Sequence, residues 1–397
     1  MLTCVLVLLA LSPAAPGPAA KPQPELPGEI KIGLSGALSG PVRALGEGMR
    51  AGISAYFARV NAGGGVFGKQ LRLIALDDVY DPALAGENMR RLIDQEKVFA
   101  ILGNPGTPTA AVAAPIANQR HVPFFGAYTG GGLLRKTPPD RYVINYRASY
   151  GEETFEMVRG LLRDAGLKPR DLAFFTQNDA YGDAGYAGAI AALKAMGYGG
   201  GQALLHVRYP RNTVDVERAL SELLDPAVHP RAVIMIGATA PCVKLIRLGR
   251  KLGLTATFVN VSFVNGDALL EQLGPAAEGV VVTQVVPPLD ANLPALNGFR
   301  ADVAKKDRGF VSLEGYLAAT AFVAGLRRAG PGAGTDAFID SLETAGPMDL
   351  GLDQPLSVTK TRHQLSSRVW PTVVRGGRFR ALRNWSEACP RKPGAGS

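Results

Sequence analysis

Histidines and glycine-rich turns are the first places to look for chemistry in this sequence. The four histidines are His121, His206, His229 and His363, and no two have the spacing by which a helix presents a pair of imidazoles to zinc. The G-x-S-x-G elbow, which presents a nucleophilic serine, does not occur. No glycine triplet precedes the Lys-Ser/Thr of a phosphate-binding loop. The sequence therefore predicts a protein that binds rather than catalyses, without a metal or cofactor.

Three aspartates, Asp77, Asp78 and Asp81, lie close together and suggest either a metal site or a turn. They follow the apolar run QLRLIAL, where a strand leaves its sheet, and Asp81–Pro82 has the pattern of a helix start. Carboxylates in such places accept hydrogen bonds from the free backbone N–H groups of the first helical turn. We therefore favour capping over metal binding.

Gly130–Gly132 is the glycine triplet with the most interesting position. It follows the apolar run VPFFGAYT, at what we expect to be the ligand-binding edge of a sheet. Glycine is needed where another group approaches the backbone closely, and a ligand is one such group. The triplet is therefore a candidate contact segment.

Short apolar runs alternate with helical patterns from Glu29 onward, which indicates parallel sheets covered by helices. The runs are EIKIGLSGAL, QLRLIALDD, VFAILGNP, VPFFGAYT, DLAFFTQ, RAVIMIGA, ATFVNVS and EGVVVTQVV. VFAIL and AVIMI are apolar throughout, so we expect both faces of these strands to be buried. The long connections between runs require right-handed parallel crossovers. The predicted fold class is α/β with two doubly wound sheets, and ligands bind beyond the carboxyl ends of such strands.

Past Leu296 the pattern changes. We expect consecutive helices and then two strands, at 296–306, 313–328, 335–344, 369–374 and 378–382.

Length and composition describe an exported globular protein. The chain has 397 residues, more than one core usually supports, with 47% hydrophobic and 19% charged residues. Residues 1–20 hold an apolar run followed by small residues and prolines, which predicts a signal peptide and a soluble mature chain in the periplasm. The net charge of +9 is scattered, so we expect no nucleic-acid partner. Cys242 and Cys389 would remain, as thiols or as a disulfide.

Several motifs in register carry a family resemblance. They are IGLSGALSGPVRALGEGMRAG, NAGGGVFGKQLRLIALDD, ILGNPGTPTAAVAAPIANQRHVPFF, NDAYGDAGYAGAI and AAEGVVVTQVVP. In this order they resemble the branched-chain amino-acid (leucine-isoleucine-valine) binding proteins of bacterial uptake transporters, over about 29–382.

The resemblance implies a type I periplasmic-binding fold, in which two lobes joined by a three-crossing hinge close over a ligand. The crossings are expected near Arg147–Ser149, Gln284–Val286 and Leu352–Pro355. The implied segments are 28–147 with 286–352 for the N-terminal lobe, 148–285 with 353–385 for the C-terminal lobe, and 386–397 for a tail.

The resemblance also implies ligand contacts, position by position. Thr107 follows VFAIL, where the family has a serine hydroxyl and a helix N-terminus for a ligand carboxylate. Tyr181, in Ala-Tyr-Gly, matches an aromatic residue that closes on the ligand from the second lobe. The remaining implied contacts before Tyr181 are Leu45, where the family often has an aromatic, and Tyr128, Thr129 and Gly130. Two of these residues have another interpretation: Thr107 could cap its helix, and Tyr128 could belong to the core.

Two positions depart from the family pattern. Thr239 replaces a tyrosine, and Ser262 replaces the glutamate that pairs with an amino acid's ammonium group. A buried ammonium without a counter-charge costs several kcal/mol. We therefore expect a carboxylate-bearing or neutral, partly apolar ligand rather than a plain branched-chain amino acid.

These features favour an extracytoplasmic solute-binding protein of an ABC uptake transporter. Its expected partners are a small-molecule ligand and the membrane permease subunits, and we expect a monomer. A ligand-sensing receptor or regulator subunit with the same fold is the alternative function.

Overall fold

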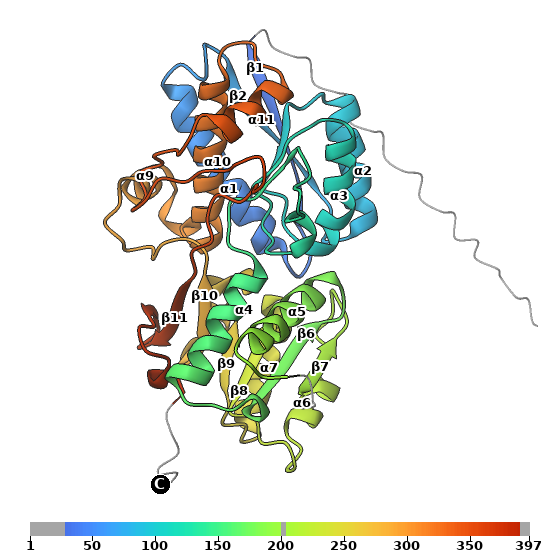
Figure 1. Cartoon of the computed structure of the whole chain (residues 1–397), viewed down its shortest axis with the longest axis vertical. Coiled ribbons are helices and arrows are strands. Elements are labelled where there is room, and N and C mark those ends of the chain that lie inside the picture. Colours follow the sequence, from blue (N-terminus) through green and yellow to red (C-terminus); the bar gives the residue numbers. More distant parts are fainter. Residues whose placement is uncertain (1–27, 200–203, 390–397) are drawn as a thin grey trace, which may run out of the picture.

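The computed structural model describes residues 28–199 and 204–389, which form two lobes placed one above the other in Figure 1. The upper lobe is built on the parallel sheet β2-β1-β3-β4-β5. The lower lobe is built on the sheet β12-β11-β10-β9-β8-β6-β7, in which β11 and β12 run antiparallel to their neighbours. The predicted α/β class with two mainly parallel sheets is confirmed. The predicted signal peptide at residues 1–20 lies outside the described residues.

The upper sheet carries helices from two distant parts of the chain. Its central strand β3 is wholly buried, as its uninterrupted apolar sequence requires. The strands are β1 (Glu29–Gly36), β2 (Gln70–Asp77), β3 (Ala100–Leu102), β4 (Phe124–Phe125) and β5 (Val143–Ile144). The helices are α1 (Arg43–Ala62), α2 (Pro82–Arg90), α3 (Thr107–Gln119), α9 (Pro294–Asp302), α10 (Phe310–Ala329) and α11 (Thr335–Thr344).

The lower sheet ends in an edge strand, β7, that the apolar pattern did not predict. From His206 to Tyr209 its sequence alternates half-buried and buried residues, as expected at an edge. The strands are β6 (Leu172–Gln177), β7 (Leu205–Tyr209), β8 (Ala232–Ile236), β9 (Thr257–Asn260), β10 (Val281–Gln284), β11 (Trp370–Arg375) and β12 (Arg378–Ala381). The helices are α4 (Tyr150–Arg159), α5 (Ala180–Ala195), α6 (Glu217–Leu223), α7 (Thr239–Lys251) and α8 (Gly266–Leu273).

The chain passes between the lobes after β5, after β10 and before β11 (Figure 1). The third crossing lies C-terminal to its expected place at Leu352–Pro355. Leu365 N donates to Asn145 O at 2.9 Å, and His363 contacts Val143 O, so this segment still belongs to the end of the upper sheet. The backbone hydrogen bonds of β5 and its following residues hold it there. The other lobe limits given by the resemblance stay a prediction.

The last described residues pack against the lower lobe. Trp385 is buried in η8 (Trp385–Glu387), and Thr257 Oγ1 donates to Ala388 O at 2.9 Å, although 386–389 were expected in a tail. Cys242 and Cys389 are both buried free thiols. Among the described residues, no helix has both the length and the apolar character needed to cross a bilayer.

Helices α1 and α10 approach each other through glycines. A Cβ atom on Gly52 would lie 1.9 Å from Ser312 O, and one on Gly315 would lie 2.6 Å from Met49 O. These distances are too short for any side chain, so the two backbones touch directly. The segment that returns after the second crossing is thereby fixed to the N-terminal part of the upper lobe.

We predict that Gly52→Ala lowers the free energy of unfolding by about 1–3 kcal/mol, because the backbones must separate. The direction of the change is informative, because helix propensity alone would make the alanine variant more stable by about 1 kcal/mol. Urea unfolding measures the change. Gly199→Ala, at a site where no atom of the described residues lies within 4 Å of the added Cβ, is the control and should stay within about 0.5 kcal/mol of the wild type. Equal effects of both substitutions would contradict the close packing.

Candidate functional site

Loops at the carboxyl ends of the strands of both sheets meet between the lobes (Figure 1). Gln177, the last residue of β6, donates through Nε2 to the hydroxyl of Tyr80, which follows β2, at 3.3 Å. The hydroxyl of Tyr128, after β4, donates to Ser262 O, after β9, at 3.1 Å. The lobes are therefore in contact across the edge where ligands bind in doubly wound sheets.

A pair of buried hydroxyls lies at the start of α3. Thr107 Oγ1 and Thr129 Oγ1 are 2.6 Å apart, and both side chains are fully buried. Thr129 Oγ1 also accepts from Gly131 N at 3.1 Å and lies 3.4 Å from the Tyr150 hydroxyl. A Cβ on Gly130 would lie 2.5 Å from Tyr150 N. The group that requires glycine at position 130 is therefore the first turn of α4.

Five aromatic rings gather beside these hydroxyls, and we call them the ring cluster: Tyr80, Tyr128, Tyr150, Tyr181 and Phe263. All five are buried. The Phe263 ring centroid is 4.5 Å from that of Tyr181, 5.7 Å from that of Tyr128 and 6.2 Å from that of Tyr80. The Tyr150 and Tyr181 centroids are 5.2 Å apart. Rings from both lobes thus pack against one another in one continuous cluster.

A buried charge network of Arg147, Glu153 and Glu314 contacts the ring cluster. Arg147 has no exposed surface, and its guanidinium lies 3.6 Å from a carboxylate oxygen of each glutamate. It also lies over the Tyr128 ring, 4.5 Å from the centroid. Burial raises the pKa of Glu314 to about 7, although the positive charge of Arg147 opposes this shift. Burial also raises the pKa of Glu153.

The structure corrects one premise of the sequence analysis. A carboxylate does lie at Ser262, supplied by Glu153 of α4 rather than by the loop after β9. Ser262 N and Ser262 Oγ donate to it at 2.8 and 2.9 Å, and Thr283 Oγ1 donates at 2.6 Å. Because this carboxylate already accepts three hydrogen bonds and faces Arg147, its charge is satisfied within the protein.

The remaining predicted contacts bond or pack within their own lobes. Tyr181 belongs to the ring cluster, and its hydroxyl lies 3.3 Å from Gly237 O. Thr239, at the start of α7, donates to Val264 O in the same lobe. Leu45 is buried in α1, and it takes no part in the hydroxyl, ring or charge contacts described above. The structure thus brings Thr107, Tyr128, Thr129, Gly130, Tyr181 and Ser262 to one place.

Sequence reasoning missed the residues that lie on other elements. Arg147 was identified only as a hinge position. Phe263 adjoins Ser262, and Tyr80 follows two aspartates at a strand end, so position alone could have suggested both. No local pattern indicates the remaining members, which are Tyr150, Glu153, Gln177 and Glu314.

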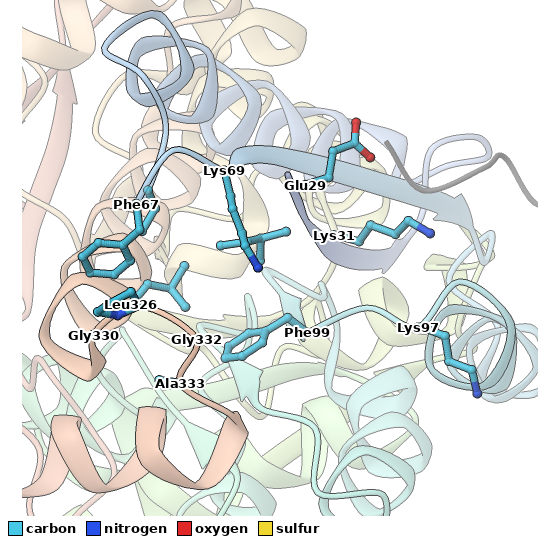
Figure 2. Close-up of a pocket in the computed structure, with 13 residues that line it drawn as sticks. Glu29, Lys31, Phe67, Lys69, Lys97, Phe99, Leu326, Gly330, Gly332 and Ala333 are labelled. Atoms are coloured by element: carbon cyan, nitrogen blue, oxygen red, sulfur yellow. The ribbon is translucent and has the colours of Figure 1, made fainter. Parts of the chain in front are cut away.

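A separate cavity of about 310 Å³ lies in the upper lobe (Figure 2). Phe67, Phe99 and Leu326 line it, together with Glu29 at the beginning of β1 and Lys69 just before β2. It therefore lies at the opposite end of the sheet from the ring cluster. The predicted ligand site does not include it.

Three comparisons with known proteins agree on one family. A family profile described as periplasmic binding protein matches residues 29–378. Leu/Ile/Val-binding protein homolog 7 of Brucella abortus is 30% identical over 225 residues, 54% of each chain. This chain thus spans about half the length of that relative. The leucine-, isoleucine-, valine-, threonine-, and alanine-binding protein of Pseudomonas aeruginosa is 25% identical over 334 residues, 76% of this chain and 79% of the relative.

A solved structure from Rhodopirellula baltica, described as a possible leucine/isoleucine/valine-binding protein, matches with a TM-score of 0.85. It is 44% identical, and the match covers 91% of this chain and 98% of that one. The type I periplasmic-binding architecture expected from the sequence is therefore confirmed.

We predict that Glu314→Gln flattens the pH dependence of stability. The carboxyl of Glu314 keeps its proton in the folded protein up to about pH 7, whereas its ordinary pKa is 4.5. Its contribution is thus fully present below the ordinary pKa and is lost as the pH rises through about 7. Over this range, the wild type should lose on the order of 3 kcal/mol more than the variant.

Urea unfolding at several pH values measures this difference. Glu222→Gln removes a glutamate from the exposed pair with Arg218 and is the control, whose curve should parallel that of the wild type. If Glu314→Gln also gives a parallel curve, Glu314 does not hold its proton in the folded state.

Proposed function

The chain belongs to the periplasmic binding protein family, and we propose that it is the extracytoplasmic solute-binding protein of an ABC uptake transporter. The family consists of binding proteins, so the expectation of binding without catalysis is confirmed. In the proposed function, the lobes close on a small molecule, and the loaded protein delivers it to membrane permease subunits. A monomer exported to the periplasm fits this function.

The observation that carries this proposal is the ring cluster. Its rings come from both lobes and meet beside the hydroxyls of Thr107 and Thr129 at the N-terminus of α3. Ligand pockets are mostly apolar, with a few polar groups that fix orientation. An arrangement shared between lobes also couples occupancy to closure, because each lobe supplies only part of the contact surface.

The charges around the cleft favour a ligand without an ammonium group. The carboxyl groups of Glu153 and Glu314 face the guanidinium of Arg147, and Arg135 is bonded to Gln364 and to backbone carbonyls. Glu153 already accepts three hydrogen bonds and faces Arg147, and Glu314 keeps its proton up to about pH 7, so neither is available to pair with an amino acid's ammonium. We therefore propose a carboxylate-bearing or neutral, partly apolar ligand.

The start of α3 suits a carboxylate. In its first turn, Thr107 and Thr109 have backbone N–H groups and Pro108 has none, and these N–H groups attract anions together with the positive end of the helix dipole. The Thr107 hydroxyl adds a donor at the same point, and the rings surround the apolar body of the ligand. An aromatic acid, a short fatty acid or an amide fits this arrangement.

We predict that benzoate or hexanoate raises the melting temperature, whereas valine does not. A ligand at a hundredfold excess over its dissociation constant stabilises the folded state by about 2.7 kcal/mol. A thermal-shift panel with benzoate, hexanoate, benzamide and valine tests this, and mass spectrometry of the recovered ligand tests that it is unchanged. Micromolar affinity for valine by calorimetry would show that an ammonium partner exists in the cleft.

We predict that Thr107→Val weakens binding of the ligand found in that panel by about three- to a hundredfold. The lost hydrogen bond contributes roughly 0.5–1.5 kcal/mol, or up to ~3 if the ligand group is charged. Stopped-flow fluorescence separates association from dissociation. Thr320→Val, which removes a helical hydroxyl bonded to Tyr316 O in α10, is the remote control. If both variants bind like the wild type, the ligand does not contact Thr107.

A further inference from the structure

The loop between β2 and α2 holds two consecutive residues in a strained conformation. Val79 and Tyr80 have φ values of +50° and +62°, a region that residues with large side chains seldom occupy. The preceding aspartates stabilise this shape. Val79 N donates to Asp77 Oδ1 at 3.0 Å, and Tyr80 N donates to Asp78 Oδ1 at 2.9 Å. An outlier held in place by such bonds points to a functional constraint.

The strained loop places the Tyr80 ring directly on the backbone before α3. Gly106 has a φ of +108°, and a Cβ atom there would lie 2.4 Å from Tyr80 Cε2. Only glycine meets both conditions, the positive φ and the close ring. The ring is thereby seated beside Thr107, the proposed contact for the ligand carboxylate.

From this seat, Tyr80 reaches the other lobe at two points. Its hydroxyl accepts from Gln177 Nε2 at 3.3 Å, and its ring lies 6.2 Å from that of Phe263 with a tilt of 37°. The side chain is buried, with 1% of its surface exposed. Tyr80 is thus the upper-lobe member of the ring cluster that lies next to the α3 N-terminus.

Resting on the proposed function, we infer that Tyr80 makes the cleft selective for planar, aromatic carboxylates. Aromatic rings interact favourably when their centroids are 4.5–7 Å apart in tilted or offset arrangements. The ring cluster has tilts of 37–49° between Phe263 and its neighbours, so a flat ring that entered the cluster would meet both faces and edges. A carboxylate at the start of α3 would hold such a ring against Tyr80. A saturated ring of the same carbon number is thicker and has no π-system.

The test compares benzoate with cyclohexanecarboxylate, which differ in planarity and aromaticity, by calorimetry on the wild type and on Tyr80→Asn. Asparagine tolerates positive φ, so this substitution removes the ring with little added strain. We expect benzoate to bind the wild type more tightly, and its advantage over cyclohexanecarboxylate to fall roughly 3- to 10-fold in the variant.

Two further variants separate selectivity from other roles of Tyr80. Tyr80→Phe keeps the ring and loses the bond to Gln177. It should speed dissociation of both probes about 2- to 10-fold and leave their affinity ratio unchanged. Val79→Asn changes the neighbouring strained residue and should leave both affinities within about twofold of the wild type. Melting temperatures of all variants establish that each is folded.

If Tyr80→Asn loses the same affinity for both probes, Tyr80 contributes to closure and not to selectivity. This result would overturn the inference. Unchanged affinities would overturn it as well. If the wild type binds neither probe, while hexanoate or benzamide binds, the aromatic specificity fails and the proposed function stands. If none of these compounds binds, the proposed ligand class fails and this inference falls with it.

Discussion

A guanidinium removed entirely from water is the constraint on which the arrangement of the two lobes depends. Arg147 lies at the first crossing between the lobes and has no exposed surface. An unpaired buried charge costs several kcal/mol, so a counter-charge must reach it. It comes from Glu153, which Ser262 and Thr283 of the lower lobe hold in place. The Glu314 carboxyl on α10 of the upper lobe lies 3.6 Å from the same guanidinium. The network therefore joins the two lobes at the hinge.

Because the charges of this network are paired within the protein, the ligand does not have to supply a counter-charge. Buried ion pairs are weak sources of stability when compared with apolar packing, but they can specify one arrangement over others. Here the carboxylates accept hydrogen bonds from neighbouring groups or face guanidiniums, and the network contacts the ring cluster where Arg147 lies over the Tyr128 ring. We infer that the charges set the geometry of the cleft. Ligand choice is left to the hydroxyls of Thr107 and Thr129 and to the ring cluster.

Burial on both faces made the central strands predictable, because a strand such as β3 or β8 has no position left for a polar residue. The edge strand β7 was not predicted, because His206 and Arg208 interrupt its apolar run. The strand β5 was not predicted either, because it is only two residues long. In the site, Thr107 and Tyr181 were expected from the family resemblance, and they lie in the first turns of α3 and α5. The carboxylate at Ser262 could not be found, because Glu153 lies 109 residues away and only the tertiary fold brings it there.

The three aspartates after β2 are a second case in which the sequence predicts local hydrogen bonds but not their consequence for the cleft. Capping was the favoured interpretation of Asp77, Asp78 and Asp81, and Asp81 does accept from Ala83 N and Leu84 N at the start of α2. Asp77 and Asp78 accept from the backbone N–H groups of Val79 and Tyr80, which are not helical. These hydrogen bonds offset the strain of a loop that no residue propensity favours. Asp78 is also bonded to the Ser35 hydroxyl at 2.8 Å, so the loop is tied to the end of β1. The short polar side chains thus determine where the Tyr80 ring lies, although none of them belongs to the ring cluster.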